Sequence, residues 1–139
     1  MSSKIWLQAA EGLHSGAIRV LRMVRAEDAR AGIGPAQLSA LSVLVFAGEK
    51  TVGELAALEQ VQPPTMSRIV DGLVQRKLVE RVNSSNDRRS VQITATPAGR
   101  KLLLAGRDRR VRALAKRFEA LTRKEVETLH AAAQIMARL

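Results

Sequence analysis

The chain has 139 residues, contains no cysteine and carries a formal net charge of +10. This length fits one compact domain, and the lack of cysteine excludes disulfides and cysteine-based zinc sites. No apolar run reaches the roughly 18–20 residues that cross a bilayer, and the N-terminus has no signal-peptide pattern. We therefore expect a cytoplasmic protein. It should be mainly helical, because aromatic residues make up only 2% of the chain and leave the core to aliphatic side chains.

The positive charge is concentrated in one segment. Residues 62–112 contain 12 Lys and Arg against four Asp and Glu, which is +8 of the total +10. Such a field attracts a polyanion, and nucleic acid is the commonest one. Charge alone favours nucleic acid only slightly over a basic surface that merely keeps the protein soluble.

The first third of the chain predicts two helices. The first runs to about Ala29, where Gly32 and Gly34 interrupt the pattern. Pro35 suits the first position of a second helix, and Gly48 is a plausible stop. The first helix carries a coiled-coil-like apolar stripe, with residues at spacings of four and three: Trp6, Ala10, Leu13, Ala17, Val20 and Val24.

Two further helix starts follow. Thr51 and Glu54 form the Thr-x-x-Glu pattern of a capping box, and Pro63-Pro64 marks the start of a helix that ends near Lys77. At 100° per residue, the second of these helices has an inward and an outward side. The inward residues are Met66, Ile69, Val70 and Leu73, and the outward residues are Pro64, Arg68, Asp71 and Gln75.

The periodicity then changes from helix to strand. Residues 78–82 and 90–94 predict two short strands, separated by the polar, turn-prone segment 83–89. A long helix resumes at Pro97, and a second capping box from Thr122 to Glu125 opens the last helix. This order of helix, turn, helix and hairpin is that of a winged helix-turn-helix.

In a winged helix-turn-helix, the helix from Pro63 to Arg76 would face the major groove. Arg68 could reach a phosphate or a guanine edge, and an arginine on the loop could enter the minor groove. Asp87 could orient such an arginine, pair with Arg81, or form a simple Asx turn. Taken alone, the helix is better interpreted as an ordinary amphipathic surface helix.

Several fragments, in order, resemble the MarR family of winged-helix regulators. They are residues 51–56, 64–70 and 78–81 with Leu73, Asp87-Arg88-Arg89, and Ile93-Thr94 followed by Gly99. The resemblance implies DNA contacts from Thr65, Ser67 and Arg68. It also implies a wing pair of Asp87 and Arg89, with Arg89 in the minor groove and Arg88 on the backbone. The candidate DNA-binding residues are Gln62, Pro64, Thr65, Ser67, Arg68, Asp87, Arg88 and Arg89.

The resemblance also implies a homodimer whose terminal helices intertwine. Residues 35–95 would form the DNA-binding lobe, and residues 1–30 and 97–139 the helical dimerisation region. Trp6 and Phe118 would then lie in the dimer core. The alternative is that these apolar stripes pack within one monomer.

An enzyme is not expected, because the chain lacks a nucleophilic cysteine, a Gly-rich phosphate loop and any His-based motif. His14 and His130 are isolated and are interpreted as helix-surface residues, so we expect neither metal nor cofactor. The predicted function is a double-stranded DNA-binding transcriptional regulator, a repressor at an inverted-repeat operator. A small-molecule effector is left open, and no ligand-binding residue is identified. The alternatives are a sequence-tolerant architectural nucleic-acid binder and a winged helix used for protein interaction.

Overall fold

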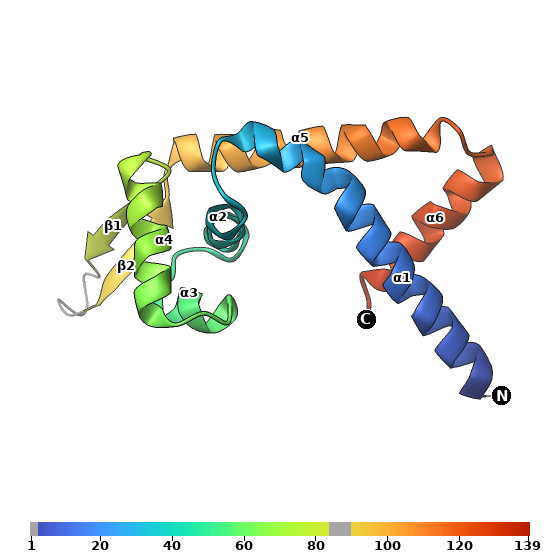
Figure 1. The fold of residues 1–139 in the computed structure, drawn as a ribbon, viewed down its shortest axis with the longest axis horizontal. Helices are drawn as coiled ribbons and strands as arrows, with labels where there is room; N and C mark the ends of the chain where they lie inside the picture. The colour runs from blue at the N-terminus through green and yellow to red at the C-terminus, as the bar shows by residue number, and fades with distance from the viewer. Residues whose placement is uncertain (1–2, 84–89) are drawn as a thin grey trace. The chain divides into compact units, whose positions relative to one another are not determined.

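The computed structural model describes residues 3–83 and 90–139. The predicted order of helices and the predicted strand pair are confirmed, with each strand displaced by one residue along the chain. The elements, in order, are α1 (Ser3–Asp28), the 3-10 helix η1 (Ala29–Ala31), α2 (Pro35–Ala47), α3 (Val52–Leu58), α4 (Pro63–Gln75), β1 (Val79–Asn83), β2 (Val91–Ala95), α5 (Pro97–Phe118) and α6 (Arg123–Met136) (Figure 1).

Packing divides the chain into two units. One consists of Met1–Glu27 and Arg109–Leu139, and the other of Asp28–Asp108. We call them the terminal unit and the central unit. The central unit contains α2, α3, α4 and both strands, and α5 begins in it and ends in the terminal unit. No single helix of the described residues is long and apolar enough to cross a membrane.

The hydrophobic core lies in the central unit, around α2. This helix is apolar on all sides, which is typical of a helix surrounded by other elements, and Leu41 is fully buried. All buried hydrophobic side chains of the described residues belong to this unit. They are Leu38, Ala40, Leu41, Leu44, Val45, Leu55, Ala56, Met66, Val70, Leu73, Leu78, Val79, Ile93 and Leu103.

Helix α4 is held closely against the start of α2 and the turn before it. A Cβ atom on Gly72 would lie 2.3 Å from Nε2 of Gln37, so a larger residue here would require the Gln37 side chain to shift. Gln37 also accepts a hydrogen bond from the backbone N–H of Gly34 at 3.3 Å. Arg76 donates to the carbonyl of Gly32, which has the positive φ of 75° expected of a helix-ending glycine.

The hairpin is attached to the core at its base. Its antiparallel register pairs Val79 with Ala95 and Arg81 with Ile93. Ile93 is buried, and it also pairs with Lys50 on its other side through backbone hydrogen bonds of 2.7 and 3.2 Å. The base of the hairpin is therefore held by hydrogen bonds against Lys50, just before α3.

Thr96 joins three elements at one point. Its N–H donates to the carbonyl of Leu78 at 3.0 Å, and its hydroxyl donates to the carbonyl of Lys77 at 2.7 Å. The same hydroxyl accepts the N–H of Gly99 at 3.1 Å and so caps the first turn of α5. The segment that links α4 to β1 and the first turn of α5 are thereby hydrogen-bonded to one residue.

The terminal helices lack a core of their own. No residue of α1 or α6 is buried. In the apolar stripe of α1, Trp6 and Leu13 are 66% and 41% exposed, whereas Ala17, Val20 and Val24 are partly covered. On α5 and α6, the exposed large apolar residues are Leu104, Val111, Leu129, Ile135 and Met136.

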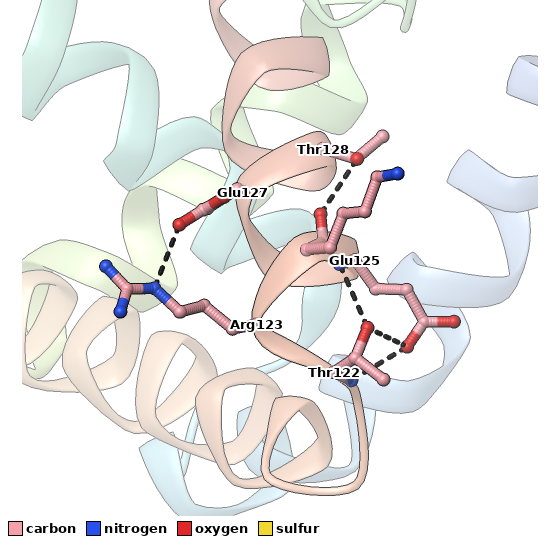
Figure 2. Close-up of polar contacts among 6 residues, drawn as sticks. Thr122, Arg123, Glu125, Glu127 and Thr128 are labelled. Carbon is pink, nitrogen blue, oxygen red and sulfur yellow. Dashed lines mark hydrogen bonds and ion pairs between the residues drawn. The ribbon is translucent and has the colours of Figure 1, made fainter.

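A capping box begins α6, as predicted (Figure 2). The hydroxyl of Thr122 accepts the N–H of Glu125 at 3.2 Å, and Glu125 accepts the N–H and the hydroxyl of Thr122 at 2.8 and 3.0 Å. These two donations, the backbone one first, lower the pKa of the Glu125 carboxyl. Along the same helix, Arg123 forms an ion pair with Glu127 at 3.0 Å.

The capping box should make the stability of the terminal helices depend on acid pH. Because the pKa of Glu125 is lowered on folding, its contribution is present above the pKa of an unfolded Glu and is lost as pH falls through the folded pKa. We expect Glu125→Ala to melt below the parent protein near neutral pH. The difference in melting temperature between the two proteins, measured by circular dichroism, should narrow below about pH 4. Glu127→Ala is the matched control, since it removes a carboxylate of the same helix whose exposed ion pair with Arg123 contributes little to stability at any pH. If Glu125→Ala lowers the melting temperature equally at neutral and acid pH, the Glu125 carboxylate does not stabilise the helix in the way described.

Candidate nucleic-acid interface

Helix α3 and the turn after it lead into α4 and set the direction of that helix. The predicted capping box is present, because Thr51 accepts the N–H of Glu54 at 3.1 Å and Glu54 accepts that of Thr51 at 3.3 Å. In the turn, Gln60 has a φ of 55°, which is uncommon outside glycine, and the N–H of Val61 donates to the carbonyl of Ala56 at 3.0 Å. The turn is therefore tight and hydrogen-bonded.

Helix α4 buries the side that the sequence predicts to face inward and exposes the side that it predicts to face outward. Met66, Val70 and Leu73 are fully buried, and Ile69 is half-buried against the core. The outward residues are exposed: Pro64, Arg68, Asp71 and Gln75. The outer surface of this helix is thus free of packing contacts and faces away from the core.

Five of the predicted DNA-binding residues lie together in the first two turns of α4. Gln62 is the N-cap residue, and its side chain makes no capping hydrogen bond. Thr65 is exposed, whereas Ser67 is only half-exposed. The remaining two members of the group, Pro64 and Arg68, are exposed. The structure thus brings Gln62, Pro64, Thr65, Ser67 and Arg68 to one end of one helix.

The prolines at the start of α4 limit how its backbone can hold an anion. An α-helix ordinarily offers free N–H groups in its first turn. Here Pro63 and Pro64 occupy the first two positions and have no N–H. Thr65 is therefore the one residue among the first three positions with a backbone donor. The first turn of α4 therefore offers few free backbone donors, and an anion there would be held mainly by side chains.

The arginines of the central unit differ in what they contact. Arg76 is engaged with the carbonyl of Gly32, and Arg81 forms an ion pair with Asp71. Arg68 is exposed and forms no hydrogen bond or ion pair with any residue in the described part of the chain. The Asp71–Arg81 contact was missed by sequence reasoning, although an acidic residue on the outward side of a basic segment was a signal for it.

The wing is anchored at its base by the register of the hairpin, which extends to Asn83 and Val91. Three predicted DNA-binding residues, Asp87, Arg88 and Arg89, lie outside the described residues. His14 and His130 are exposed on helices, as interpreted from the sequence. No group of three or more potential metal-ligating side chains lies within residues 3–83 and 90–139.

Comparison with known proteins identifies the family. A model described as "MarR family" matches residues 31–90. The uncharacterized HTH-type transcriptional regulator Mb0904 of Mycobacterium bovis is 34% identical over 130 residues, covering 94% of this chain and 91% of the relative. The HTH-type transcriptional repressor MdtR of Bacillus subtilis is 34% identical over 68 residues, 49% of this chain and 44% of the repressor.

A solved structure shows the same fold over almost the whole chain. The transcriptional regulator Tm0710 of Thermotoga maritima superposes with a TM-score of 0.82 at 24% identity, covering 95% of this chain and 96% of that one. The helix-turn-helix, the hairpin at its side and the exposed outer surface of α4 are the parts of a DNA-binding lobe. The chain therefore belongs to the MarR family and is a DNA-binding transcriptional regulator with a winged helix-turn-helix fold.

Proposed function

We propose that the protein is a repressor that binds a pseudo-palindromic operator in double-stranded DNA as a homodimer. The observation that carries the proposal is the outer surface of α4. Its first two turns gather the candidate contact residues on a helix whose other side is locked into the core. The excess of positive charge in residues 62–112 supports a polyanionic partner, and one relative is named a repressor. Such a regulator acts where the DNA is, in the cytoplasm.

In the proposed complex, the start of α4 enters the major groove. Arg68 is long enough to reach a guanine edge or a phosphate, while Thr65 and Ser67 are short and let the helix backbone approach. Gln62 has an amide that the helix cap does not use, and Pro64 offers an apolar contact. Asp87, Arg88 and Arg89, between the two strands in sequence, would meet the flanking minor groove, where an arginine is favoured by the negative potential.

The proposed dimer is formed by the terminal helices. Since α1 and α6 have no buried residue, their apolar side chains need a surface to cover them, and a second copy of the chain provides the same side chains in return. Trp6 and Phe118 would lie in this interface. The two copies of α4, the recognition helices of the dimer, would then bind half-sites about one turn of the DNA helix apart, roughly 34 Å.

Release from DNA would require a ligand that favours a different spacing of the two recognition helices. The terminal unit has a cavity of about 320 Å³ beside the end of α1. Apolar side chains line it together with two basic ones and one acidic one, and the excess of one positive charge favours a small apolar acid. The lining residues are Met23, Val24, Ala26, Glu27, Ala113, Leu114, Lys116 and Arg117.

The test of the proposed function is selection of bound sequences from a random duplex pool by the purified protein at physiological salt. Recovery of an inverted repeat with half-sites about one turn apart supports the operator and the dimer together. Recovery of no motif, with affinity that collapses as salt rises, would instead favour an architectural nucleic-acid binder.

Two substitutions should separate the two kinds of DNA contact. With the selected duplex, Arg68→Ala should weaken binding by roughly 5- to 150-fold and relax the preference at particular base pairs. Arg89→Ala should weaken binding and, if the main contact of Arg89 is to the DNA backbone, reduce the salt dependence by about one phosphate equivalent. Fluorescence anisotropy over a range of salt, on the selected duplex and on duplexes with single base changes, measures both effects. An unchanged affinity for Arg68→Ala would contradict the placement of α4 in the major groove.

A further inference from the structure

One ion pair connects the wing strand with the outer surface of the recognition helix. Nη2 of Arg81 on β1 contacts Oδ1 of Asp71 on α4. Both side chains are partly open to solvent, with 38% of Arg81 and 58% of Asp71 exposed. An ion pair this exposed contributes little to folding stability. Its position suggests another role.

The backbone determines which side chains meet. Residues two apart on a strand share a face, so Arg81 extends on the same side as Val79, which is buried against the core. Strand β1 packs on α4, and from this side of the strand Arg81 reaches Asp71 on that helix. Asp71 lies one turn after Arg68 on the helix, so these two residues are neighbours on the outer surface.

A carboxylate at this position is unfavourable for DNA binding unless it is neutralised. Asp71 is on the surface that would approach the phosphates, and like charges brought together across an interface weaken binding. It is also at the spacing at which an acid pairs with an arginine of the same helix, here Arg68. In the structure, Asp71 is paired with Arg81, and Arg68 has no polar partner among residues 3–83 and 90–139.

We propose that Arg81 is a positioning residue for DNA binding: it occupies the carboxylate of Asp71 and so keeps Arg68 available for DNA. This inference rests on the proposed function, in which the outer surface of α4 meets the DNA. Arg81 acts through Asp71 and Arg68 and needs no DNA contact of its own.

A double-mutant cycle on the full chain tests this role. The variants are Arg81→Gln, Asp71→Asn and the two combined, each titrated by fluorescence anisotropy against the duplex recovered by selection. Arg81→Gln should weaken binding about tenfold, since the carboxylate of Asp71 is then free to pair with Arg68 and to withdraw it from the DNA. Asp71→Asn alone should change DNA affinity by less than about threefold. When Arg81→Gln is added to the Asp71→Asn variant, DNA affinity should again fall by less than about threefold.

The cycle separates this role from two others. If Arg81 only held the wing in place, Asp71→Asn would weaken binding as much as Arg81→Gln does. If Arg81 contacted DNA itself, Arg81→Gln would cost the same with or without Asp71. Either result overturns the inference. A further cycle with Arg68→Ala should show Arg81→Gln losing most of its effect, because Arg68 is then absent.

The control is another exposed ion pair, Arg123 with Glu127 on α6. Arg123→Gln removes the same charge as Arg81→Gln, and both variants should keep the melting temperature of the parent protein. Arg123→Gln should leave DNA affinity unchanged within about twofold, apart from the small effect of net charge. If Arg68→Ala weakens binding and Arg81→Gln does not, only this inference fails. If neither weakens binding, the proposed placement of α4 fails as well.

Discussion

Replacing Gly99 with alanine should lower the free energy of unfolding of the central unit by about 3 kcal/mol, the cost of severe overpacking. A Cβ atom at this position would lie 2.0 Å from the carbonyl oxygen of Leu78 and 3.0 Å from its carbonyl carbon. Both are backbone atoms, and the carbonyl oxygen of Leu78 already accepts the N–H of Thr96. Neither can move without displacing the start of β1 or of α5.

The measurement is urea unfolding followed by far-UV circular dichroism. Gly53→Ala is the matched control, because a Cβ there would meet only the hydroxyl of Thr51, at 3.9 Å. This control should leave stability unchanged or raise it by up to about 1 kcal/mol, since alanine is a better helix former. Equal midpoints for the two variants would show that α5 can shift away from Leu78 at little cost.

Replacing Leu129 with glutamate should convert the proposed dimer to a monomer and reduce affinity for the full operator by about 100-fold or more. Leu129 is 43% exposed on α6, and a glutamate there would place a charge in the apolar contact between two chains. A monomer binds one half-site and loses the gain from binding two half-sites at once.

Sedimentation velocity measures the assembly, and anisotropy with the full operator and with a single half-site measures binding. Ala131→Glu makes a similar change on the opposite side of α6 and should leave the dimer intact. A monomeric parent protein, or a Leu129→Glu variant that stays dimeric, would show that the terminal helices associate in another way.

The local signals of the sequence predicted the fold well. Capping boxes, prolines and glycines act within a few residues, so the starts of α2, α3, α4 and α6 were predicted correctly, as was the stop at Gly48. The inward side of α4 was also correct, because helix periodicity alone determines it. The strands were displaced by one residue, since turn-prone polar segments mark the limits of a hairpin less sharply than a cap marks a helix.

The contacts between elements were not predictable in the same way. Arg81 had one suggested partner, Asp87, on the loop beside it in sequence, yet the structure pairs it with Asp71 on a different element. Arg76 was counted with the free positive charge, but it donates to the carbonyl of Gly32. Such pairings depend on how helix and strand pack together, which local periodicity does not encode.

The hydrogen bonds of Thr96 have a mechanical consequence. Because α5 is one continuous helix that begins at Pro97, directly after this residue, and ends in the terminal unit, a twist of α5 about its axis would be transmitted to its first turn as torque. There the hydroxyl and N–H of Thr96 hold the carbonyls of Lys77 and Leu78, the residues that link α4 to β1. A rotation of the long helix would therefore act directly on the segment that links the recognition helix α4 to the wing strand β1.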